Sequence, residues 1–252
     1  MMKWFSFSCL FLIIPLLLSA QKQIRLNEGS AIMVPFSYGF QFSAGDLAER
    51  FDNNGMLQLG VEYWTPNSFI FGVQSGFQFG SDVKEDVLAT LRTEEGFLIS
   101  TDRQVADVRL RQRGFYSGAF IGKLFQIDPN NPRSGIRVDL GSGLLQHKIR
   151  IQDDPNITVA SLLDDYRKGY DRLTNGLALS QYIGYQVLSR NRRINLSVGA
   201  DFIQGFTQNR RSFDFDTQMQ DTRERLDLLW GLRATLTLPF YLESKGTEGI
   251  IY

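Results

Sequence analysis

Side chains that commonly carry catalysis are scarce in this chain. His147 is the only histidine among the 252 residues, and Cys9 is the only cysteine. Asp153, Asp154 and Ser161 follow His147 closely, and a Ser–His–Asp arrangement performs acyl transfer when the imidazole reaches the hydroxyl. Since no nucleophile motif such as G-x-S-x-G is present, we predict no catalytic residue and interpret His147 as a rim histidine.

The same residues offer little to a metal ion, a cofactor or a nucleic acid. His147 has no second histidine or nearby cysteine to complete a zinc site, and the aspartates at 153, 154, 164 and 165 lack the spacing of a calcium loop. The stretch GKLF (residues 122–125) lacks the glycines of a phosphate-binding loop. Basic and acidic residues number 27 each. We therefore predict no metal, no cofactor and no nucleic-acid partner.

The first twenty residues have the pattern of an export signal. Lys3 precedes an apolar run over residues 4–18, and small residues follow at 19 and 20. We predict a signal peptide over residues 1–20 that is cleaved on export; an uncleaved anchor is the alternative, although the run is short for a span of about 20 residues. Cys9 lies inside this segment, so the exported chain has no disulfide.

Beyond residue 30, large apolar residues alternate with small or polar residues. The stretch AIMVPFSYGFQFSAGD (residues 31–46) has an apolar side chain at every second position from Ile32 to Phe42. Period two is typical of a strand, because successive side chains point to opposite faces. Seven further segments follow, and the last alternates from Leu226 to Phe240. In the fourth segment we assign the apolar phase to Val108, Leu110, Tyr116, Phe120 and Leu124.

The connections between the eight segments are of two kinds. Links after the second, fourth and sixth segments are short and rich in Pro, Asn, Gly or Arg, as turns are. Links after the others are longer, and three of them are long and charged, at about residues 81–107, 153–175 and 208–224. The stretch ITVASLLDDYRKGYDRLT (residues 157–174) has room for a helical turn or two. This arrangement predicts an up-and-down meander with two unlike ends.

The phase opposite to the apolar residues is small, hydrogen-bonding or charged with both signs. A charge that faces lipid at mid-depth costs about 2–4 kcal/mol, so these residues suit an inner face. We expect Arg233 to pair with Asp201 on the adjacent strand, and a lower cluster to form around Arg137. The predicted interior polar network comprises Glu62, Arg113, Arg137, Asp139, Asp201 and Arg233.

Aromatic residues gather toward the ends of the predicted strands. Two aromatic belts, one at each water interface, are expected of a barrel that crosses a membrane. The predicted girdle comprises Phe40, Phe42, Tyr63, Phe69, Phe77, Phe79, Tyr185, Phe202 and Phe240.

These patterns together predict the fold. Lipid offers no hydrogen bonds, so every strand must pair and the sheet must close on itself. Eight strands close around a space that side chains just fill, which leaves no aqueous pore. We predict an all-β fold, a closed eight-stranded antiparallel up-and-down transmembrane β-barrel over residues 31–242. A soluble lipocalin-like cup, with the apolar face turned inward around a ligand, is the alternative.

The chain resembles the small eight-stranded outer-membrane barrels, the class that includes the OmpA, OmpX and OmpW transmembrane domains. More narrowly, AGDLAERFDNNG, SFIFGVQSGFQFGSDVKEDVLATLRTEEG and VRLRQRGFYSGAFIGKLF are similar to an uncharacterised barrel family of Bacteroidota. The stretch LTLPFYL (residues 236–242) is similar to the terminal signal read by the outer-membrane insertion machine. The resemblance implies export to the Gram-negative outer membrane, with residues 21–30 and 243–252 in the periplasm. It supplies no site residue.

The resemblance also implies a class of function. We expect a non-enzymatic barrel with a structural or interaction role, which presents extracellular loops or serves as an accessory subunit of a secretion or assembly complex. Its expected partners are outer-membrane lipids, lipopolysaccharide and other outer-membrane or periplasmic subunits. A lipid-modifying enzyme acting through His147 (an acyltransferase or deacylase) and a narrow channel are the alternatives. A surface of mixed charge is the alternative to lipopolysaccharide contact by the loop arginines. These are Arg103, Arg167, Arg172, Arg210, Arg211, Arg223 and Arg225.

Overall fold

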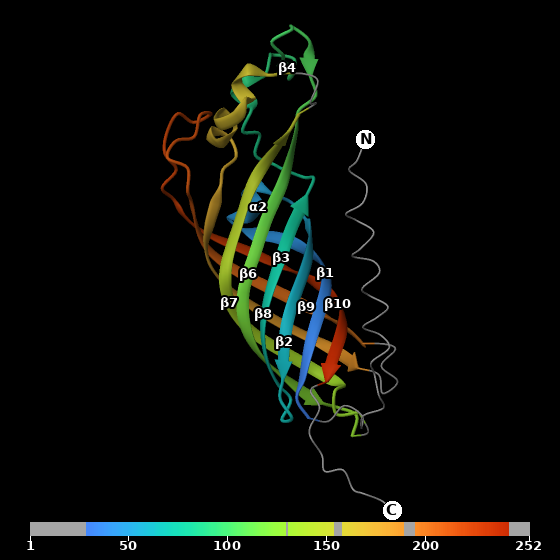
Figure 1. Cartoon of the computed structure of the whole chain (residues 1–252). Coiled ribbons are helices and arrows are strands. Elements are labelled where there is room, and N and C mark those ends of the chain that lie inside the picture. Colours follow the sequence, from blue (N-terminus) through green and yellow to red (C-terminus); the bar gives the residue numbers. More distant parts are fainter. Residues whose placement is uncertain (1–28, 130, 154–157, 189–194, 242–252) are drawn as a thin grey trace, which may run out of the picture.

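The structure, a computed structural model, describes residues 29–129, 131–153, 158–188 and 195–241. The predicted signal peptide, residues 21–28 and the C-terminal tail lie outside the described residues. Eight strands form one sheet (Figure 1). They are β1 (Ala31–Gly45), β2 (Asn54–Trp64), β3 (Phe69–Gly80), β6 (Arg109–Gln126), β7 (Gly135–Gln152), β8 (Thr174–Leu188), β9 (Asn195–Asn209) and β10 (Glu224–Tyr241).

The sheet closes because β1 has a hydrogen-bonded neighbour on each side. It pairs with β2 and, along its whole length, with β10, from Ala31 opposite Tyr241 to Gly45 opposite Asp227. All eight pairings are antiparallel, and spatial order follows chain order around the ring. The predicted eight-stranded antiparallel barrel is thereby confirmed.

The two ends of the barrel differ, as the connections predict. At one end β2 and β3 are joined by a turn in which Ser68 has a φ of 61°. At the other end the long loops gather above the ring and carry all the short elements (Figure 1). These elements are α2 (Leu47–Arg50), η1 (Ala89–Leu91), β4 (Leu98–Ile99), β5 (Val105–Ala106), η2 (Ala160–Leu162) and η3 (Asp164–Gly169). η2 and η3 confirm the helical turns expected within residues 157–174. No helix in the described part of the chain is long and apolar enough to cross a bilayer.

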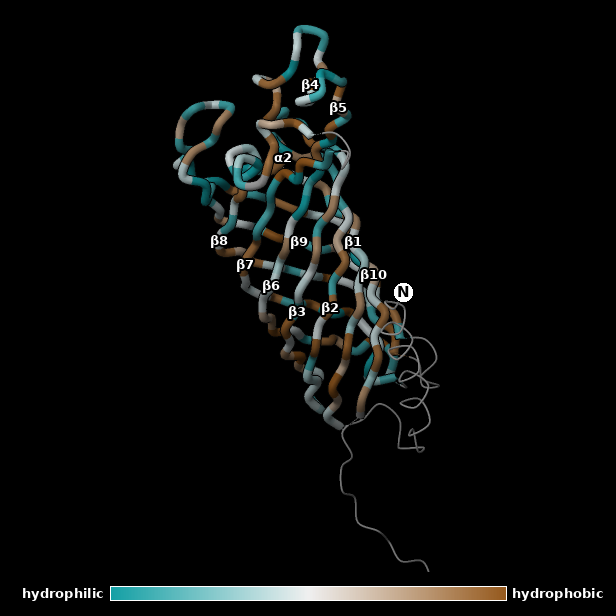
Figure 2. Tube along the Cα trace, turned by 45° about the horizontal axis from the view of Figure 1, so that its top comes forward, coloured by the Kyte–Doolittle hydropathy of each residue, from teal (hydrophilic) through white to brown (hydrophobic). Residues whose placement is uncertain are grey.

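The outer face of the barrel is apolar. Hydrophobic and hydrophilic residues alternate along the strands (Figure 2), and the hydrophobic ones are those left exposed. In β10, for example, Leu232 is 65% exposed, whereas its neighbour Arg233 is 6% exposed. A lipocalin-like cup requires the opposite arrangement, with the apolar phase inside. The structure therefore does not have the geometry of that alternative.

The predicted phase of β6 is wrong. Tyr116, Phe120 and Leu124 point into the barrel and are buried, whereas Phe115 and Ile121 point outward and are nearly half exposed. Both phases of this strand carry aromatic residues. Tyr116 is accommodated inside because its hydroxyl donates to Oγ of Ser180 at 2.9 Å. The inversion turns the arginines at 109, 111 and 113 to the outer wall.

The interior of the barrel is filled in three layers. A lower apolar layer lies at the short-turn end, and an upper apolar layer continues into the long loops. A polar layer lies between them. The lower layer comprises Ala31, Met33, Trp64, Ile70, Phe120, Leu124 and Leu188. Members of the upper layer include Leu47, Phe51, Met56, Leu145, Ile149, Ile203 and Leu229.

Candidate functional site

Arg137 is the centre of the lower part of the polar layer. Its Nη2 lies 2.7 Å from Oε1 of Glu62, and its Nε lies 2.9 Å from both carboxylate oxygens of Asp139. Trp64 donates its indole N–H to Oε2 of Glu62 at 2.9 Å. All three charged side chains are less than 8% exposed. Such a buried group is fully effective only while each member keeps its partner.

Arg233 is the centre of the upper part of the polar layer. Its Nη1 lies 3.4 Å from Oδ1 of Asp201, so the pairing expected from the sequence is present. Its Nη2 lies 3.9 Å from Oδ2 of Asp139, which links the two parts. The guanidinium also lies 4.0 Å from the ring centroid of Tyr182, within the range of a cation–π contact. Gln41 donates to Asp201 at 3.4 Å and extends the network across the barrel.

The network joins facing walls of the ring. Glu62 belongs to β2, Arg137 and Asp139 to β7, Asp201 to β9 and Arg233 to β10. With three carboxylates and two guanidinium groups, this set carries one formal negative charge. Since apolar layers lie on both sides of it, the described interior is a packed core.

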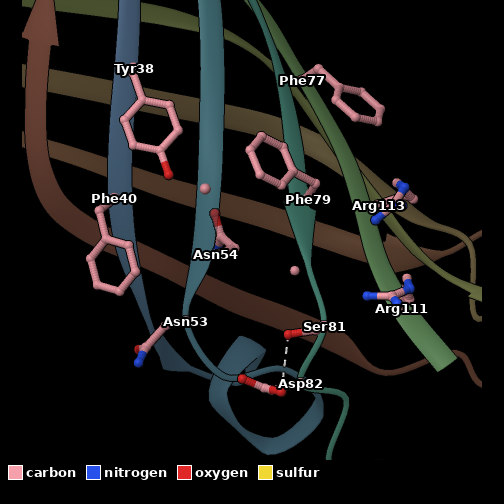
Figure 3. A pocket seen from close by; sticks show the side chains of 12 residues that line it. Tyr38, Phe40, Asn53, Asn54, Phe77, Phe79, Ser81, Asp82, Arg111 and Arg113 are labelled. Atoms are coloured by element: carbon pink, nitrogen blue, oxygen red, sulfur yellow. Dashed lines mark hydrogen bonds between the residues drawn. The ribbon is translucent and has the colours of Figure 1, made fainter. Parts of the chain in front are cut away.

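Arg113, the sixth residue predicted for this network, is not part of it. Its position on β6 places it on the outer wall, where its guanidinium lies 6.0 Å from the ring centroid of Phe77. Arg111 lies beside it on the same face, and Phe79 lies next to both (Figure 3). The physical reason is the inverted phase of β6, which is set by the burial of Tyr116 and Phe120.

The residues predicted for the aromatic girdle all belong to the outward phase of their strands. Phe42 stacks on Trp230 with ring centroids 4.6 Å apart, and Phe77 stacks on Phe79 at 6.3 Å. Phe202 is the central residue of β9, so its height differs from that of a residue at a strand end. The outward and largely exposed members are Phe40, Tyr63, Phe69, Phe77, Tyr185, Phe202 and Phe240.

His147 lies inside the barrel, so the rim position predicted for it is wrong. It is 1% exposed, and its Nε2 lies 2.7 Å from Oδ2 of Asp227. Thr207 also donates its hydroxyl to Oδ2 of Asp227, and the ring of Phe51 packs edge-on against the imidazole. Nδ1 of His147 has no hydrogen-bond partner among the described residues. Among the described residues, Ser161, on η2 in a loop, makes no hydrogen bond with the imidazole, and Asp154 lies outside the described residues.

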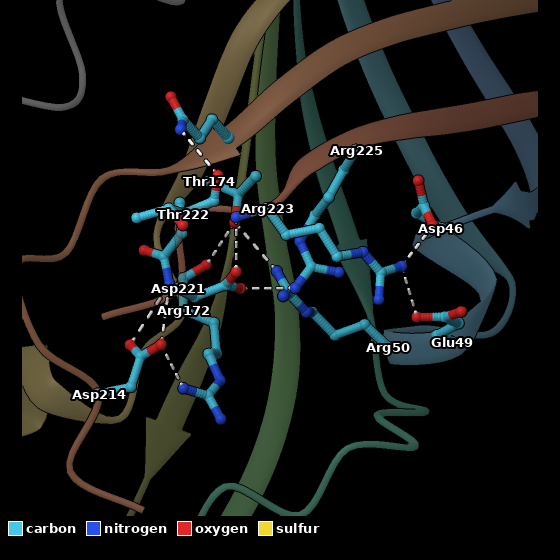
Figure 4. A network of polar contacts seen from close by, with 12 residues as sticks. Asp46, Glu49, Arg50, Arg172, Thr174, Asp214, Asp221, Thr222, Arg223 and Arg225 are labelled. Carbon is cyan, nitrogen blue, oxygen red and sulfur yellow. Dashed lines mark hydrogen bonds and ion pairs between the residues drawn. The ribbon is translucent and has the colours of Figure 1, made fainter. Parts of the chain in front are cut away.

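Above the barrel, arginines and carboxylates connect the four long loops. We call the described residues of 46–53, 81–108, 153–173 and 210–223 the loop cap. Glu85 accepts from Arg50 at 2.8 Å and from Arg172 at 2.9 Å, and Arg172 also contacts Asp214 at 2.6 Å and Asp216 at 2.5 Å. These contacts join all four loops, and Figure 4 shows the one between Arg172 and Asp214. The loop cap is therefore a cross-linked cover over the ring.

Two pKa values in the loop cap reflect this arrangement. Burial lowers the pKa of Arg172, but its carboxylate neighbours, first Glu85, outweigh burial and raise that pKa above its usual value. The hydrogen bond from the backbone N–H of Leu226 lowers the pKa of Asp46, and Arg223 adds to this effect. Both groups are therefore held in their charged forms.

Most of the loop arginines predicted to meet lipopolysaccharide already have an acidic partner. Arg167 pairs with Asp153 at 2.5 Å, and Arg211 pairs with Asp171 at 2.6 Å. The remaining paired members are Arg172, Arg223 and Arg225, whereas Arg210 donates to the amide oxygen of Asn175. Of the seven, Arg103 is the one for which the described residues supply no ion pair or hydrogen bond through its side chain. These arginines mainly hold the loop cap together.

No family model and no curated protein matches the chain, so its resemblance to a Bacteroidota family stays a prediction. Solved structures with a similar fold include Ail, the attachment invasion locus protein of Yersinia pestis, with 12% identity and a TM-score of 0.41 over 84% of this chain and 100% of that one. Ail in complex with the heparin analogue sucrose octasulfate gives 14% identity and a TM-score of 0.36 over the same shares. The N-terminal β-barrel domain of Pseudomonas aeruginosa OprF gives 10% identity and a TM-score of 0.38, over 84% of this chain and 98% of that one. The barrel assignment depends on the strand pairing of the chain itself.

The sequence reasoning missed two features of the site. Apolar residues such as Leu145 and Ile203 fill the upper interior, where we expected polar ones. The pairing of His147 with Asp227 was also missed, because 80 residues separate the two. Among the described residues, no three histidine, cysteine or acidic side chains gather to hold a metal ion.

Proposed function

We propose that this protein is a non-enzymatic barrel of the outer membrane that anchors and presents its loop cap at the cell surface. The observation that carries this proposal is the outer face, where large apolar side chains on every barrel strand are left exposed. A soluble protein rarely exposes a continuous apolar surface of this extent. Lipid around the barrel would remove the free-energy cost of exposing this apolar surface to water.

The length of the apolar stretch fits the thickness of a bilayer. On β6 the outward phase is mainly apolar from Phe115 to Phe125. These eleven residues, at about 3.3 Å each and tilted by about 45°, rise about 26 Å. The apolar band of an outer-membrane barrel is about 25 Å tall. β6 continues above this band to Arg109, which accounts for its length of 18 residues.

The loop cap supports an interaction role. It leaves several large apolar side chains exposed, among them Phe97, Val105, Tyr166, Phe213 and Met219. Because ion pairs hold the loops, these side chains are presented on a pre-ordered surface, which lowers the entropic cost of binding. Whether the partner is a subunit of a secretion or assembly complex is tested by purification of the native membrane protein in mild detergent.

The geometry does not favour the two alternative functions. An acyltransferase needs its base beside an accessible nucleophile, whereas His147 is buried and contacts a carboxylate. A channel needs an aqueous path, whereas the interior is filled by two apolar layers and a charged one. Planar-bilayer recordings of the purified protein are expected to show no steady conductance.

A substitution on the outer face tests the proposed membrane location. Leu140 is 58% exposed and lies midway between Ile136 and Leu144, the ends of the outward apolar stretch of β7, so Leu140→Lys is expected to destabilise the protein in vesicles by about 2–4 kcal/mol. Phe97→Lys is the matched control, because Phe97 is 51% exposed but lies in the loop cap. Urea unfolding in phosphatidylcholine vesicles measures both. Equal and small effects of the two substitutions would show that lipid does not surround β7.

A further inference from the structure

A group of cations lies on the outer wall at the top of the hairpin formed by β6 and β7. In the antiparallel register Arg113 is opposite Lys148, and Arg111 is opposite Arg150. All four side chains belong to the outward phase of their strands. We call them the outer cationic group. They stand directly above Phe115, where the apolar band of β6 begins.

The outer cationic group is poorly neutralised by the protein. Among the described residues no carboxylate lies within 4.0 Å of Arg111, Arg113 or Arg150, and Lys148 approaches Asp171 only to 3.8 Å. Asp171 itself lies closer to Arg211, at 2.6 Å. This differs from the loop cap, where most arginines have acidic partners. Adjacent like charges repel, so an external anion beside this group would stabilise it.

A groove of about 570 Å³ opens next to this group on the outer face (Figure 3). Tyr38 and Phe40 of β1 line one side, and Phe77 and Phe79 of β3 line the other. Arg111 and Arg113 stand at its margin, and Asn53, Ser81 and Asp82 line its loop end. The groove is therefore aromatic on its walls and cationic along one edge.

Gly55 of β2 forms the floor between the two aromatic walls. A Cβ atom at this position would lie 2.8 Å from Cζ of Phe79 and 3.3 Å from the hydroxyl of Tyr38. The ring of Phe79 and the hydroxyl of Tyr38 therefore lie close over Gly55, which is possible only because residue 55 has no side chain. A larger residue there would displace these rings and change the shape of the groove while leaving the charges in place.

Building on the proposed membrane location, we propose that this groove and the outer cationic group bind a phosphorylated, acylated glycolipid of the outer leaflet, lipopolysaccharide. Its phosphate groups would lie against Arg111, Arg113 and Arg150, and one acyl chain would lie in the groove against the aromatic side chains of its walls. Guanidinium groups suit phosphate because their N–H donors match its oxygens in pairs. The site lies at the height where the headgroups of the surrounding lipid meet its acyl chains.

The position of the site favours a lipid over a protein or free anion. The arginines flank an outward apolar surface of the barrel wall, whereas a protein partner would more readily reach the exposed tips of the loop cap. Free phosphate would use the cations but not the aromatic groove. The proposal therefore requires that both the phosphates and the acyl chains contribute to binding.

The test measures lipid retention by the full chain reconstituted in phosphatidylcholine nanodiscs. Diphosphorylated hexa-acyl lipid A is titrated, and native mass spectrometry counts the lipid kept on release of the protein. Arg111→Gln/Arg113→Gln/Arg150→Gln is expected to weaken retention about 100-fold or more, since several charged hydrogen bonds are lost. Arg103→Gln/Lys168→Gln/Arg210→Gln removes the same charge from exposed loop positions and is expected to change retention less than about threefold.

Two further arms separate the contributions of phosphate and acyl chain. Monophosphorylated lipid A is expected to bind wild-type protein about tenfold more weakly. Gly55→Val is expected to weaken the binding of lipid A. The concentration of inorganic phosphate that competes with lipid A at the arginines is expected to stay unchanged. Equal weakening by both triple variants would mean that net charge alone attracts the lipid, and full retention by the arginine variant would also overturn the proposal. If wild-type protein fails to insert into the nanodisc at all, the proposed membrane location fails instead.

Discussion

Replacing Arg137 should reveal how strongly the barrel depends on its interior charges. Arg137→Met keeps an unbranched apolar chain about as long as the methylene stem of arginine but removes the guanidinium. Glu62 and Asp139, with side chains 3% and 7% exposed, would then be buried without their main partner. Removing one member of a buried ion pair costs about 3–5 kcal/mol, which corresponds to a shift of about 100-fold to several thousand-fold in the unfolding equilibrium. Arg233 lies 3.9 Å from Asp139 and offsets part of this cost, so we expect the lower half of the range.

Reversible urea unfolding in vesicles, followed by the heat-modifiable shift of the folded band in gels, measures this effect. The triple variant Arg137→Met/Glu62→Gln/Asp139→Asn removes all three charges and is expected to recover much of the lost stability. Asp201→Asn is the contrasting single variant, because it removes the excess negative charge of the layer and should cost little. A loss below about 1 kcal/mol for Arg137→Met would refute the view that these carboxylates are buried and depend on it.

Three further outcomes follow from the structure. His147→Leu should lower the free energy of unfolding by about 2–3 kcal/mol because Asp227 loses a charged hydrogen bond, and the profile of envelope lipids should not change. Arg172→Met should expose the loop cap to trypsin while the heat-modifiable transition of the barrel stays in place. The pKa of Asp46 is lowered, so its hydrogen bond to the N–H of Leu226 should hold above the ordinary value of about 3.8 and be lost as the pH falls below it. Amide hydrogen exchange measures the protection of the Leu226 N–H relative to its intrinsic exchange rate. Asp46→Asn should remove the pH dependence of that protection.

The barrel could be predicted because lipid-facing and interior positions follow a strict alternation in most strands. In β1 one phase is apolar from Ile32 to Phe42 and the other is small or polar, so a single reading fits. β6 breaks this rule because Phe115 and Tyr116 are adjacent aromatic residues that point to opposite faces. Contacts across the barrel, such as the hydrogen bond from Tyr116 to Ser180 on β8, decide which ring is inside, and such contacts are not visible in the sequence of one strand.

The site was less predictable than the fold. Arg137, Asp139 and Glu62 could be grouped because their phase and height follow from counting along each strand. The upper apolar layer could not be predicted, because Leu145 and Ile203 belong to the inward phase of their strands. Most other inward residues near them in sequence are polar, so these two look like exceptions to the pattern. The outer cationic group was missed for another reason: the inverted phase assigned to β6 placed its arginines inside the barrel, so their alignment with Lys148 and Arg150 on the outer face of β7 was not expected.

The charges of the polar layer also affect how the chain inserts into the bilayer. Its members come from β2, β7, β9 and β10, so no single hairpin holds a complete set. β2 and β3 alone would carry Glu62 into hydrocarbon without Arg137, its partner on β7, and an unmatched charge there is costly. Piecewise entry of hairpins is thus unfavourable. We expect the strands to associate at the membrane surface and to insert in one cooperative step. Pairing of β1 with β10 would close the barrel as the interior ion pairs form.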